Sequence, residues 1–284
     1  NSRGGIECDL TVARLAEDHY YIVTGTGFRT HDFAWIADHI PTGARARLTD
    51  VTEDYATLVL MGPKARTILQ QVTTADVSNE AFPFGTARII PVAGYPVRAL
   101  RVTYVGELGW ELHMEKAGAG AVFDALMAAG GRFGLAPAGY RAIESLRLEK
   151  FYRAWAADIT PNDTPFQAGL GWAVKLKGGK PFIGRAALAA AADKPLTKLL
   201  AGFTTAREDV VLAGRETILR NGKFAGYLTS GGYGYSLGRP IGMGYIRNAE
   251  GVDAAYVEAG SYELVVANEV AQAQVPLTPL WDPE

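Results

Sequence analysis

The sequence predicts an α+β protein, in which a mixed region of strands and helices is followed by a small all-β barrel or sandwich. Two observations carry this prediction. Residues 100–151 show the pattern of strand, tight turn, strand, helix and helix, and short β-type runs follow one another closely beyond residue 195. With 284 residues, 48% of them hydrophobic, the chain is long enough for about two domains. We expect these domains over residues 1–195 and 196–284.

The first elements expected are two strands, over residues 10–15 and 20–24, because both runs are rich in β-branched and aromatic residues. An amphipathic helix is expected over residues 31–40, where apolar residues recur at helical spacing until Pro41 ends the pattern. A buried strand over residues 57–60 follows. The next helix is expected to run through Ala65, Ile68 and Leu69.

The middle of the chain is expected to hold paired strands and two longer helices. One pair of strands lies on either side of the turn at residues 94–96. A second pair, over residues 100–104 and 110–114, is separated by a break that contains two glycines. Helices are expected over residues 118–130 and 139–151, and the inner face of the second is expected to consist of Ile143, Leu146 and Phe151.

The last part of the chain follows an alanine-rich helix, over residues 186–192, that Pro195 ends. Asn221 and Gly222 form the strongest short hairpin signal in this part. Short β-type runs at such close spacing are typical of a small barrel or sandwich. The runs expected to form its strands are residues 199–203, 216–220, 224–229, 241–246 and 262–266.

Composition and motifs argue against several classes of function. The 28 basic and 30 acidic side chains give a net charge of −2, which argues against nucleic acid as a partner. No apolar run approaches the ~20 residues that cross a bilayer, so we expect no membrane association. Cys8 is the only cysteine, and none of the four histidines has metal-ligand spacing, so we expect no metal site. The sequence contains neither a dinucleotide-binding fingerprint nor a P-loop.

The start of the sequence has neither an initiator methionine nor the charged leader and apolar stretch of a secretory signal. From this we expect that the chain is a fragment of a longer protein.

Three carboxylates are candidates for function from the residues alone. Asp9, just before the first expected strand, is either a turn residue bonded to its own backbone or a functional group. Glu107 is either a solvated turn charge or part of a site. Strand alternation places Glu111 on the face opposite Trp110 and Leu112. Such a carboxylate accepts paired N–H donors from an aminopyrimidine, or serves as a general base, and the residues alone do not decide between these uses.

Several motifs then occur in order. They are RGGIECDL (residues 3–10), YVGELGWELHM (104–114), SLRLEKFYRAWAADITPNDTPFQAGLGWAVKL (145–176) with FIGRAAL (182–188), and LTSGGYGYSLGRPIGMGYI (228–246). Together they resemble the aminomethyltransferase family, the T-protein of the glycine cleavage system, over nearly the whole chain. The resemblance implies an α+β, multi-domain, T-protein-like folate-binding fold with a C-terminal all-β barrel domain.

Within that family, LRLEKFYRAWAADIT (residues 146–160) is most similar to the folate-binding half of flavin-linked dimethylglycine and sarcosine dehydrogenases or oxidases. This implies a tetrahydrofolate-dependent transfer of a one-carbon unit from a small N-methylated amine, forming methylenetetrahydrofolate. It also implies that the first part of the folate domain, and an amine-oxidising FAD domain of the same polypeptide, lie upstream. The expected location is the cytoplasm, or the mitochondrial matrix in a eukaryote.

The resemblance assigns a catalytic role to Asp9, which matches the aspartate of the family's Gly-Gly-x-x-x-Asp motif. Thr11 matches a folate-contacting position and is expected on the same side of the strand as Asp9. One position departs from the family, because Ile143 stands where free T-proteins carry an arginine. The arginine contacts to the acidic tail of folate are therefore not assigned.

The second part of the implied folate site is the segment around Glu111, which matches the carboxylate that holds the pterin ring. Glu107 and Gly109 form the adjoining loop. Tyr104 precedes this loop and either lines the face of the ring or belongs to the core.

Two alternative functions stay open. The first is a stand-alone aminomethyltransferase, or a folate-dependent demethylase of a small sulfur or amine compound, truncated at its N-terminus. An upstream G-x-G-x-x-G strand–helix unit would favour the flavin-linked enzyme over it. The second is a non-catalytic folate-binding relative, which would bind folinic acid without turning over a one-carbon donor.

Overall fold

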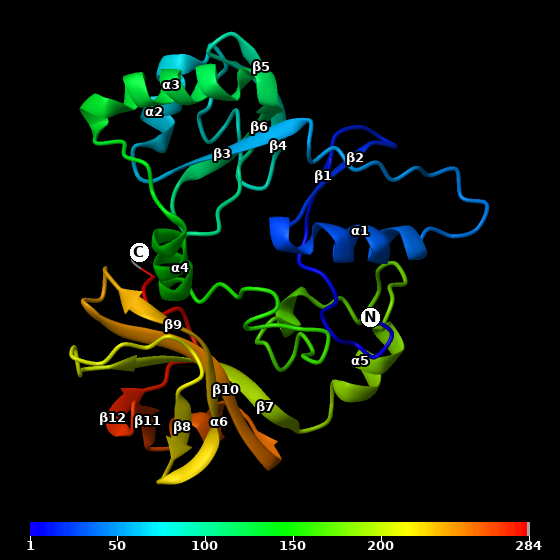
Figure 1. Cartoon of the computed structure of the whole chain (residues 1–284). Coiled ribbons are helices and arrows are strands. Elements are labelled where there is room, and N and C mark those ends of the chain that lie inside the picture. Colours follow the sequence, from blue (N-terminus) through cyan, green and yellow to red (C-terminus); the bar gives the residue numbers. More distant parts are fainter. Residues whose placement is uncertain (283–284) are drawn as a thin grey trace. The chain divides into compact units, whose positions relative to one another are not determined.

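The computed structural model describes residues 1–282 and divides the chain into two compact units. One unit combines Asn1–Asp9 with Gly139–Glu284, and the other is Leu10–Ala138 (Figure 1). The first unit is therefore discontinuous in sequence. The domain boundary expected at residue 195 stays a prediction. Over residues 1–282, no helix is both long enough and apolar enough to span a bilayer.

The unit Leu10–Ala138 is built on a four-stranded antiparallel sheet in the order β3-β6-β5-β4. The helices that pack on this sheet and on each other are α2 (Ala65–Val72) and α3 (Ala119–Gly130) (Figure 1). The strands are β3 (Tyr55–Met61), β4 (Ala87–Val92), β5 (Tyr95–Leu100) and β6 (Gly109–Glu115).

The hydrophobic core of this unit lies between the helices and one face of the sheet. Trp110 and Leu112 alternate along β6 and are fully buried, and they pack in one cluster with Val97 of β5 and Ile68 of α2. Each large apolar side chain buried in this way contributes about 1.5–3 kcal/mol to folding. Because alternate residues of a strand point to opposite faces, this core leaves the other face of the sheet to Glu111 and its neighbours.

The same unit begins with a two-stranded hairpin, β1 (Thr11–Arg14) and β2 (Tyr20–Val23), followed by α1 (Arg29–Asp38). These elements agree with the two strands and the helix expected there. The buried side chain of α1 is Asp32, which accepts a hydrogen bond from the hydroxyl of Thr24. The buried contact of α1 is thus polar, whereas the spacing of its apolar residues predicts an apolar inner face.

The strand expected over residues 100–104 is wrong, because β5 ends at Leu100 and residues 101–108 form a loop. Leu100 pairs with Glu111, which is the last point at which β5 and β6 run side by side. The chain then bends, with the amide of Val102 donating to the carbonyl of Leu100 at 3.1 Å. Tyr104 consequently belongs to a loop, and the predicted tight turn is a longer connection.

The discontinuous unit contains a closed antiparallel barrel in the order β10-β7-β12-β11-β8-β9. The barrel confirms the predicted all-β C-terminal part, and with the mixed unit before it confirms the α+β class. A short helix, α6 (Ala254–Glu258), connects β10 to β11. The strands are β7 (Leu196–Thr205), β8 (Thr217–Arg220), β9 (Lys223–Gly234), β10 (Arg239–Val252), β11 (Tyr262–Val266) and β12 (Glu269–Gln274).

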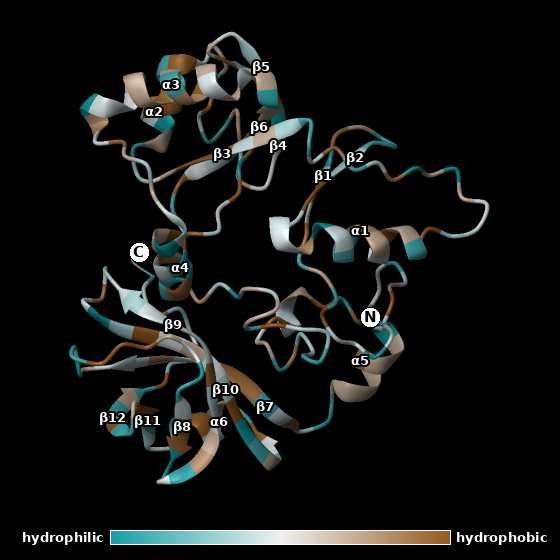
Figure 2. Cartoon of the chain, in the orientation of Figure 1, coloured by the Kyte–Doolittle hydropathy of each residue, from teal (hydrophilic) through white to brown (hydrophobic). Residues whose placement is uncertain are grey.

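A local sequence pattern accounts for the barrel's first hairpin but not for its last. Asn221 and Gly222 have φ angles of 52° and 74° and join the paired residues Arg220 and Lys223, as the Asn-Gly signal predicts. The strand β12 was not expected from the sequence. Half of its residues are polar, and Ala271 is the one that it buries. By contrast, β7 carries a long hydrophobic run that the sequence makes evident (Figure 2).

Two α-helices precede the barrel, α4 (Tyr140–Glu149) and α5 (Arg185–Ala191), and α4 packs against β9 and β10. The inner face expected for α4 is wrong in part. Ile143 and Leu146 are only half-buried, whereas Phe151 is buried but lies beyond the helix. The short 3-10 helices of the chain are Thr26–Phe28, Lys116–Gly118, Gly131–Phe133 and Gly171–Ala173.

The buried face of α4 carries charge. Arg147 is 1% exposed, and its guanidinium donates to the fully buried carboxylate of Asp158 at 2.5 Å and to the hydroxyl of Ser230 in β9 at 2.8 Å. Asp158 also accepts hydrogen bonds from Ser230 at 2.8 Å and from the amide of Ala154 at 2.9 Å. The charges are thus paired and hydrogen-bonded, and they connect α4, the segment after it and the barrel.

We expect Arg147→Met to lower the free energy of unfolding by about 3–5 kcal/mol, because it leaves the buried carboxylate of Asp158 without its counter-charge. Urea denaturation followed by circular dichroism measures the change. The control is Lys150→Met, one residue beyond the same helix, which breaks the exposed pair with Asp282 and should cost less than about 1 kcal/mol. Equal losses in the two variants would contradict a special role for the buried pair.

Candidate functional site

The strand β6 presents Glu111 on the face of the sheet that α2 and α3 do not cover. Its neighbours across the sheet are Val59 on β3 and Leu100 on β5. The Glu111 side chain is 23% exposed, whereas Trp110 and Leu112 on either side of it are fully buried. The structure therefore agrees with the alternation expected from the sequence and leaves the carboxylate partly open to solvent.

The next residue on the same face is His113, which is only 2% exposed. Its Nε2 lies 3.3 Å from Oε2 of Glu111, and its Nδ1 lies 3.0 Å from the hydroxyl of Thr57 and 3.3 Å from that of Tyr21. Within residues 1–282, Oε1 of Glu111 takes part in no hydrogen bond with the protein. Oε2 of the carboxylate is thus held by His113, and Oε1 is available to a ligand.

An arginine extends this polar face toward β5. The Arg98 guanidinium carbon lies 4.1 Å from the ring centre of Tyr21 and 5.5 Å from that of Tyr55. The Nε and Nη1 atoms of Arg98 are buried and have no hydrogen-bond partner among the described residues, so stacking on the two rings is their main favourable contact. Burial raises the pKa of Tyr21, while the charge of Arg98 acts in the opposite direction.

Gly109, the first residue of β6, packs closely against β3. A Cβ atom at this position would lie 2.1 Å from the carbonyl oxygen of Leu60 and 2.4 Å from Sδ of Met61. Since no larger residue fits without moving β3, Gly109 sets the register that brings Glu111 opposite Val59. The predicted part of Gly109 in a folate-binding loop stays a prediction.

The other predicted residues of this unit lie beside β6 or in the hairpin. Tyr104 and Glu107 belong to the loop over residues 101–108, in which Tyr104 is 37% exposed and Glu107 is half-buried. Thr11 is the first residue of β1 and pairs with Val23 of β2. Their contacts with a folate stay predictions.

Asp9 belongs to the other unit, at the end of its N-terminal segment, and it is exposed. That segment is fixed at Ile6, whose amide donates to the carbonyl of Asp163 at 3.1 Å and whose carbonyl accepts from the indole of Trp155 at 3.0 Å. Gly5 is required here, because a Cβ would lie 1.9 Å from the carbonyl oxygen of Pro161. The strand β1 begins only at Thr11, so the strand alternation expected to relate Asp9 to Thr11 does not apply.

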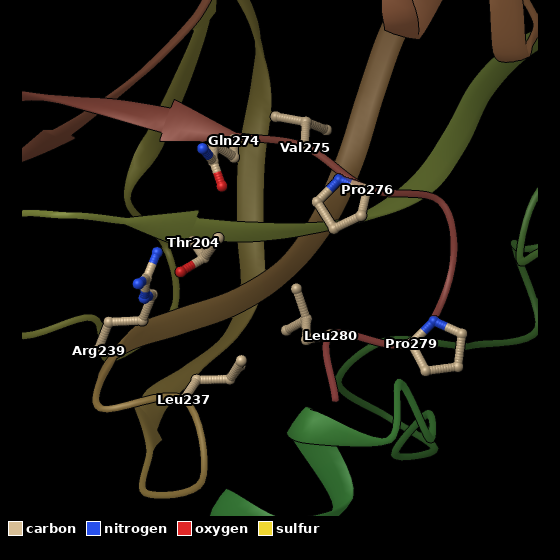
Figure 3. Close-up of a pocket in the computed structure, with 8 residues that line it drawn as sticks. All are labelled: Thr204, Leu237, Arg239, Gln274, Val275, Pro276, Pro279 and Leu280. Atoms are coloured by element: carbon tan, nitrogen blue, oxygen red, sulfur yellow. The ribbon is translucent and has the colours of Figure 1, made fainter. Parts of the chain in front are cut away.

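The discontinuous unit contains two cavities. One, of about 370 Å³, is bordered by Thr204, Arg239, Gln274 and Leu280 (Figure 3). The other, of about 670 Å³, is lined mainly by apolar groups and includes Ile6 in its wall. Neither cavity is lined by any of the six residues predicted from the sequence.

Sequence reasoning missed His113, Tyr21 and Arg98. Four scattered histidines without metal-ligand spacing gave no reason to single out one of them. The available signal was the spacing of two residues between Glu111 and His113 on an expected strand, which puts both side chains on one face. The approach of Tyr21 and Arg98 depends on tertiary structure and has no such signal.

We expect Gly109→Ala to lower the free energy of unfolding by about 1–3 kcal/mol, because the new methyl group overlaps the backbone of β3. Thermal unfolding measured by calorimetry tests this. The matched control is Gly120→Ala in α3, where a Cβ meets nothing within 4 Å and where alanine should raise stability by about 0.5–1 kcal/mol. A variant Gly109→Ala as stable as the parent would refute the close approach.

Comparison with known proteins gives relatives along the whole chain. Sarcosine dehydrogenase of Mus musculus is 42% identical over all of this chain and 32% of its own length. Dimethylglycine dehydrogenase of Homo sapiens is 36% identical over 86% of this chain and 28% of its own length. The chain thus spans about a third of the length of these curated relatives. Both proteins are named as mitochondrial.

A solved structure and two domain models match as well. The glycine cleavage system aminomethyltransferase T of Bartonella henselae is similar with a TM-score of 0.82, at 27% identity, over 99% of this chain and 74% of that one. The model of the GCVT N-terminal domain matches residues 1–178, and that of the glycine cleavage T-protein C-terminal barrel domain matches residues 198–282. The chain therefore belongs to the glycine cleavage T-protein family, as an aminomethyltransferase-like protein related to the sarcosine and dimethylglycine dehydrogenases.

Proposed function

We propose that this chain is the tetrahydrofolate-dependent one-carbon transfer region of a flavin-linked enzyme that oxidises an N-methylated glycine such as sarcosine or dimethylglycine. The observation that carries the proposal is Glu111, whose partly open carboxylate has one oxygen held by His113 and the other without a hydrogen bond to any residue that the structure describes. The relationship to two N-methylglycine dehydrogenases supports the choice of substrate class.

The surroundings of Glu111 support a pterin ring as its ligand. A carboxylate accepts two parallel N–H donors of an aminopyrimidine in charge-assisted bonds, which fix both the position and the orientation of the ring. The surrounding sheet face supports this use, since Val59, opposite Glu111 on β3, is an exposed apolar neighbour. Glu111 would thus orient the ring and contribute through proximity, without making or breaking a bond.

Tetrahydrofolate, when bound, supplies the amine nitrogens that take up the one-carbon unit. Asp9 is proposed as the group that removes the proton from the reacting amine and stabilises the nearby positive charge. Its exposed position at the end of an anchored segment supports access to a ligand. The one-carbon unit would come from an FAD domain of the same polypeptide, which oxidises the N-methylated amine to an iminium or its formaldehyde equivalent.

A stand-alone aminomethyltransferase is the second candidate. The match to the Bartonella henselae aminomethyltransferase T over 99% of this chain favours it. The two candidates differ in the donor of the carbon unit, which is an N-methylated glycine for the first and a protein-borne aminomethyl group for the second. An assay with sarcosine and the full-length protein distinguishes them, because only the first candidate forms methylenetetrahydrofolate from sarcosine.

We expect Glu111→Gln to weaken the binding of 5-formyltetrahydrofolate about 30-fold, because the amide loses the negative charge and one of the two acceptors. Isothermal titration calorimetry measures the dissociation constant. The control is Glu115→Gln, an exposed position four residues along the same strand, which should change the constant less than about twofold. Unchanged affinity in Glu111→Gln would exclude Glu111 as the group that holds the ring.

We expect Asp9→Asn to slow the formation of methylenetetrahydrofolate by a factor of about 10² to 10⁴, while folate affinity stays within a few fold of the parent's. The measurement is the ratio of methylenetetrahydrofolate to free formaldehyde released from sarcosine by the full-length protein. Asp18→Asn, in the exposed turn between β1 and β2, is the control and should leave the ratio unchanged. An unaltered transfer rate in Asp9→Asn would rule out this residue as the catalytic group.

A further inference from the structure

His113 is a buried titratable residue that the proposed function does not yet use. It lies where β2, β3, β5 and β6 meet, and its neighbours there are Tyr21, Thr57, Arg98 and Glu111. The rings of Tyr21 and His113 are 5.5 Å apart and nearly perpendicular, at 83°. With the tyrosine ring on one side and strands β3 and β5 on the others, the imidazole is fixed in a single orientation.

The hydrogen-bond partners determine which ring nitrogen carries the proton in the neutral imidazole. Nδ1 faces the hydroxyls of Thr57 and Tyr21, both of which can donate to it. Nε2 faces the carboxylate oxygen of Glu111, which can only accept when ionised. The arrangement therefore assigns the proton to Nε2, and the raised pKa of Tyr21 keeps its hydroxyl protonated as a donor.

We propose that His113 is a positioning residue for the folate site, whose Nε2–H holds Oε2 of Glu111 in one orientation and leaves Oε1 and the second lone pair of Oε2 for the two N–H donors of the pterin. This inference rests on the proposed function of Glu111. It resembles the arrangement in which a group behind a functional side chain fixes that side chain's geometry. Without the hydrogen bond, the partly exposed carboxylate would have to be ordered by the ligand itself, at a cost in affinity.

A purely structural role for His113 makes a different prediction. If His113 only fills space in the core, replacing it should weaken folate binding to the same degree whether or not residue 111 carries a carboxylate. A positioning residue acts through Glu111, so its effect disappears once the carboxylate is gone. The two roles are therefore separated by the coupling between the residues rather than by the size of either single effect.

The experiment is a double-mutant cycle on the full chain with His113→Phe, Glu111→Gln and the double variant. Affinity for 5-formyltetrahydrofolate is measured by isothermal titration calorimetry. We expect His113→Phe alone to weaken binding about tenfold, as expected for loss of one hydrogen bond to a charged acceptor. In the Glu111→Gln background the same change should cost less than about twofold. Met114→Leu, on the opposite face of the same strand, is the control for disturbed packing of β6.

If His113→Phe does not fold, other variants test the same coupling between His113 and Glu111. Thr57→Val and Tyr21→Phe remove the hydroxyls behind the imidazole and keep similar shapes, so together they should weaken folate binding several fold in the parent and not in Glu111→Gln. His113→Gln, which keeps a side-chain N–H, should recover part of the affinity that His113→Phe loses.

The outcomes of the cycle distinguish a failure of the role proposed for His113 from a failure of the role proposed for Glu111. If the fold-losses of affinity caused by His113→Phe and Glu111→Gln multiply in the double variant, His113 does not act through the carboxylate. The inference then fails, while the function of Glu111 stands. If Glu111→Gln alone leaves the affinity unchanged, the proposed function of Glu111 fails, and the role of His113 fails with it. A loss confined to the parent background supports both.

Discussion

The constraint on which the candidate site depends is the position of β6 in the middle of its sheet. Because helices α2 and α3 cover one face, every second residue of β6 must be apolar, and Trp110 and Leu112 meet that requirement. The alternate residues Glu111 and His113 point to the other face and are polar. The packing of the core therefore determines where the charged group stands, and the approach of Gly109 to β3 determines its register.

The discontinuous unit depends on a different interaction, because it buries full charges. Arg147 and Asp158 are both inaccessible to solvent, and the hydroxyl of Ser230 joins them to β9. Such a group of charges is stable only when each partner has its hydrogen bonds, so it requires α4, the segment after it and the barrel to adopt one arrangement. Leu148, the residue after Arg147, packs in an apolar cluster with barrel residues such as Leu200 and Ile241, which makes that arrangement favourable.

Most elements could be predicted from local patterns, and the exceptions have identifiable causes. The hairpin at Asn221 follows from the turn preference of Asn-Gly, and the alternation around Glu111 follows from the two-residue period of a strand, so the sequence predicts both correctly. The loop after Leu100 was missed because its residues are as β-prone as those of a strand, and only the bend at Val102 ends the pairing. His113 could not be assigned a function from the sequence, because its partner Tyr21 comes from a hairpin 92 residues earlier in the chain. Tertiary contacts of this kind leave no local pattern.

The way the barrel closes has a consequence for its dynamics. β10 pairs with β7 continuously from Ile241 to Arg247, whereas β12 pairs with β7 only at Ala273 and Gln274. The bond from the amide of Gly202 to the carbonyl of Pro276, at 2.9 Å, extends this seam by one step. A closed sheet opens where its ladder is shortest, so thermal fluctuations should separate β12 from β7 before any other pair of strands. Amide protons along that seam would then exchange with solvent through local opening, while those between β7 and β10 would require the whole barrel to unfold.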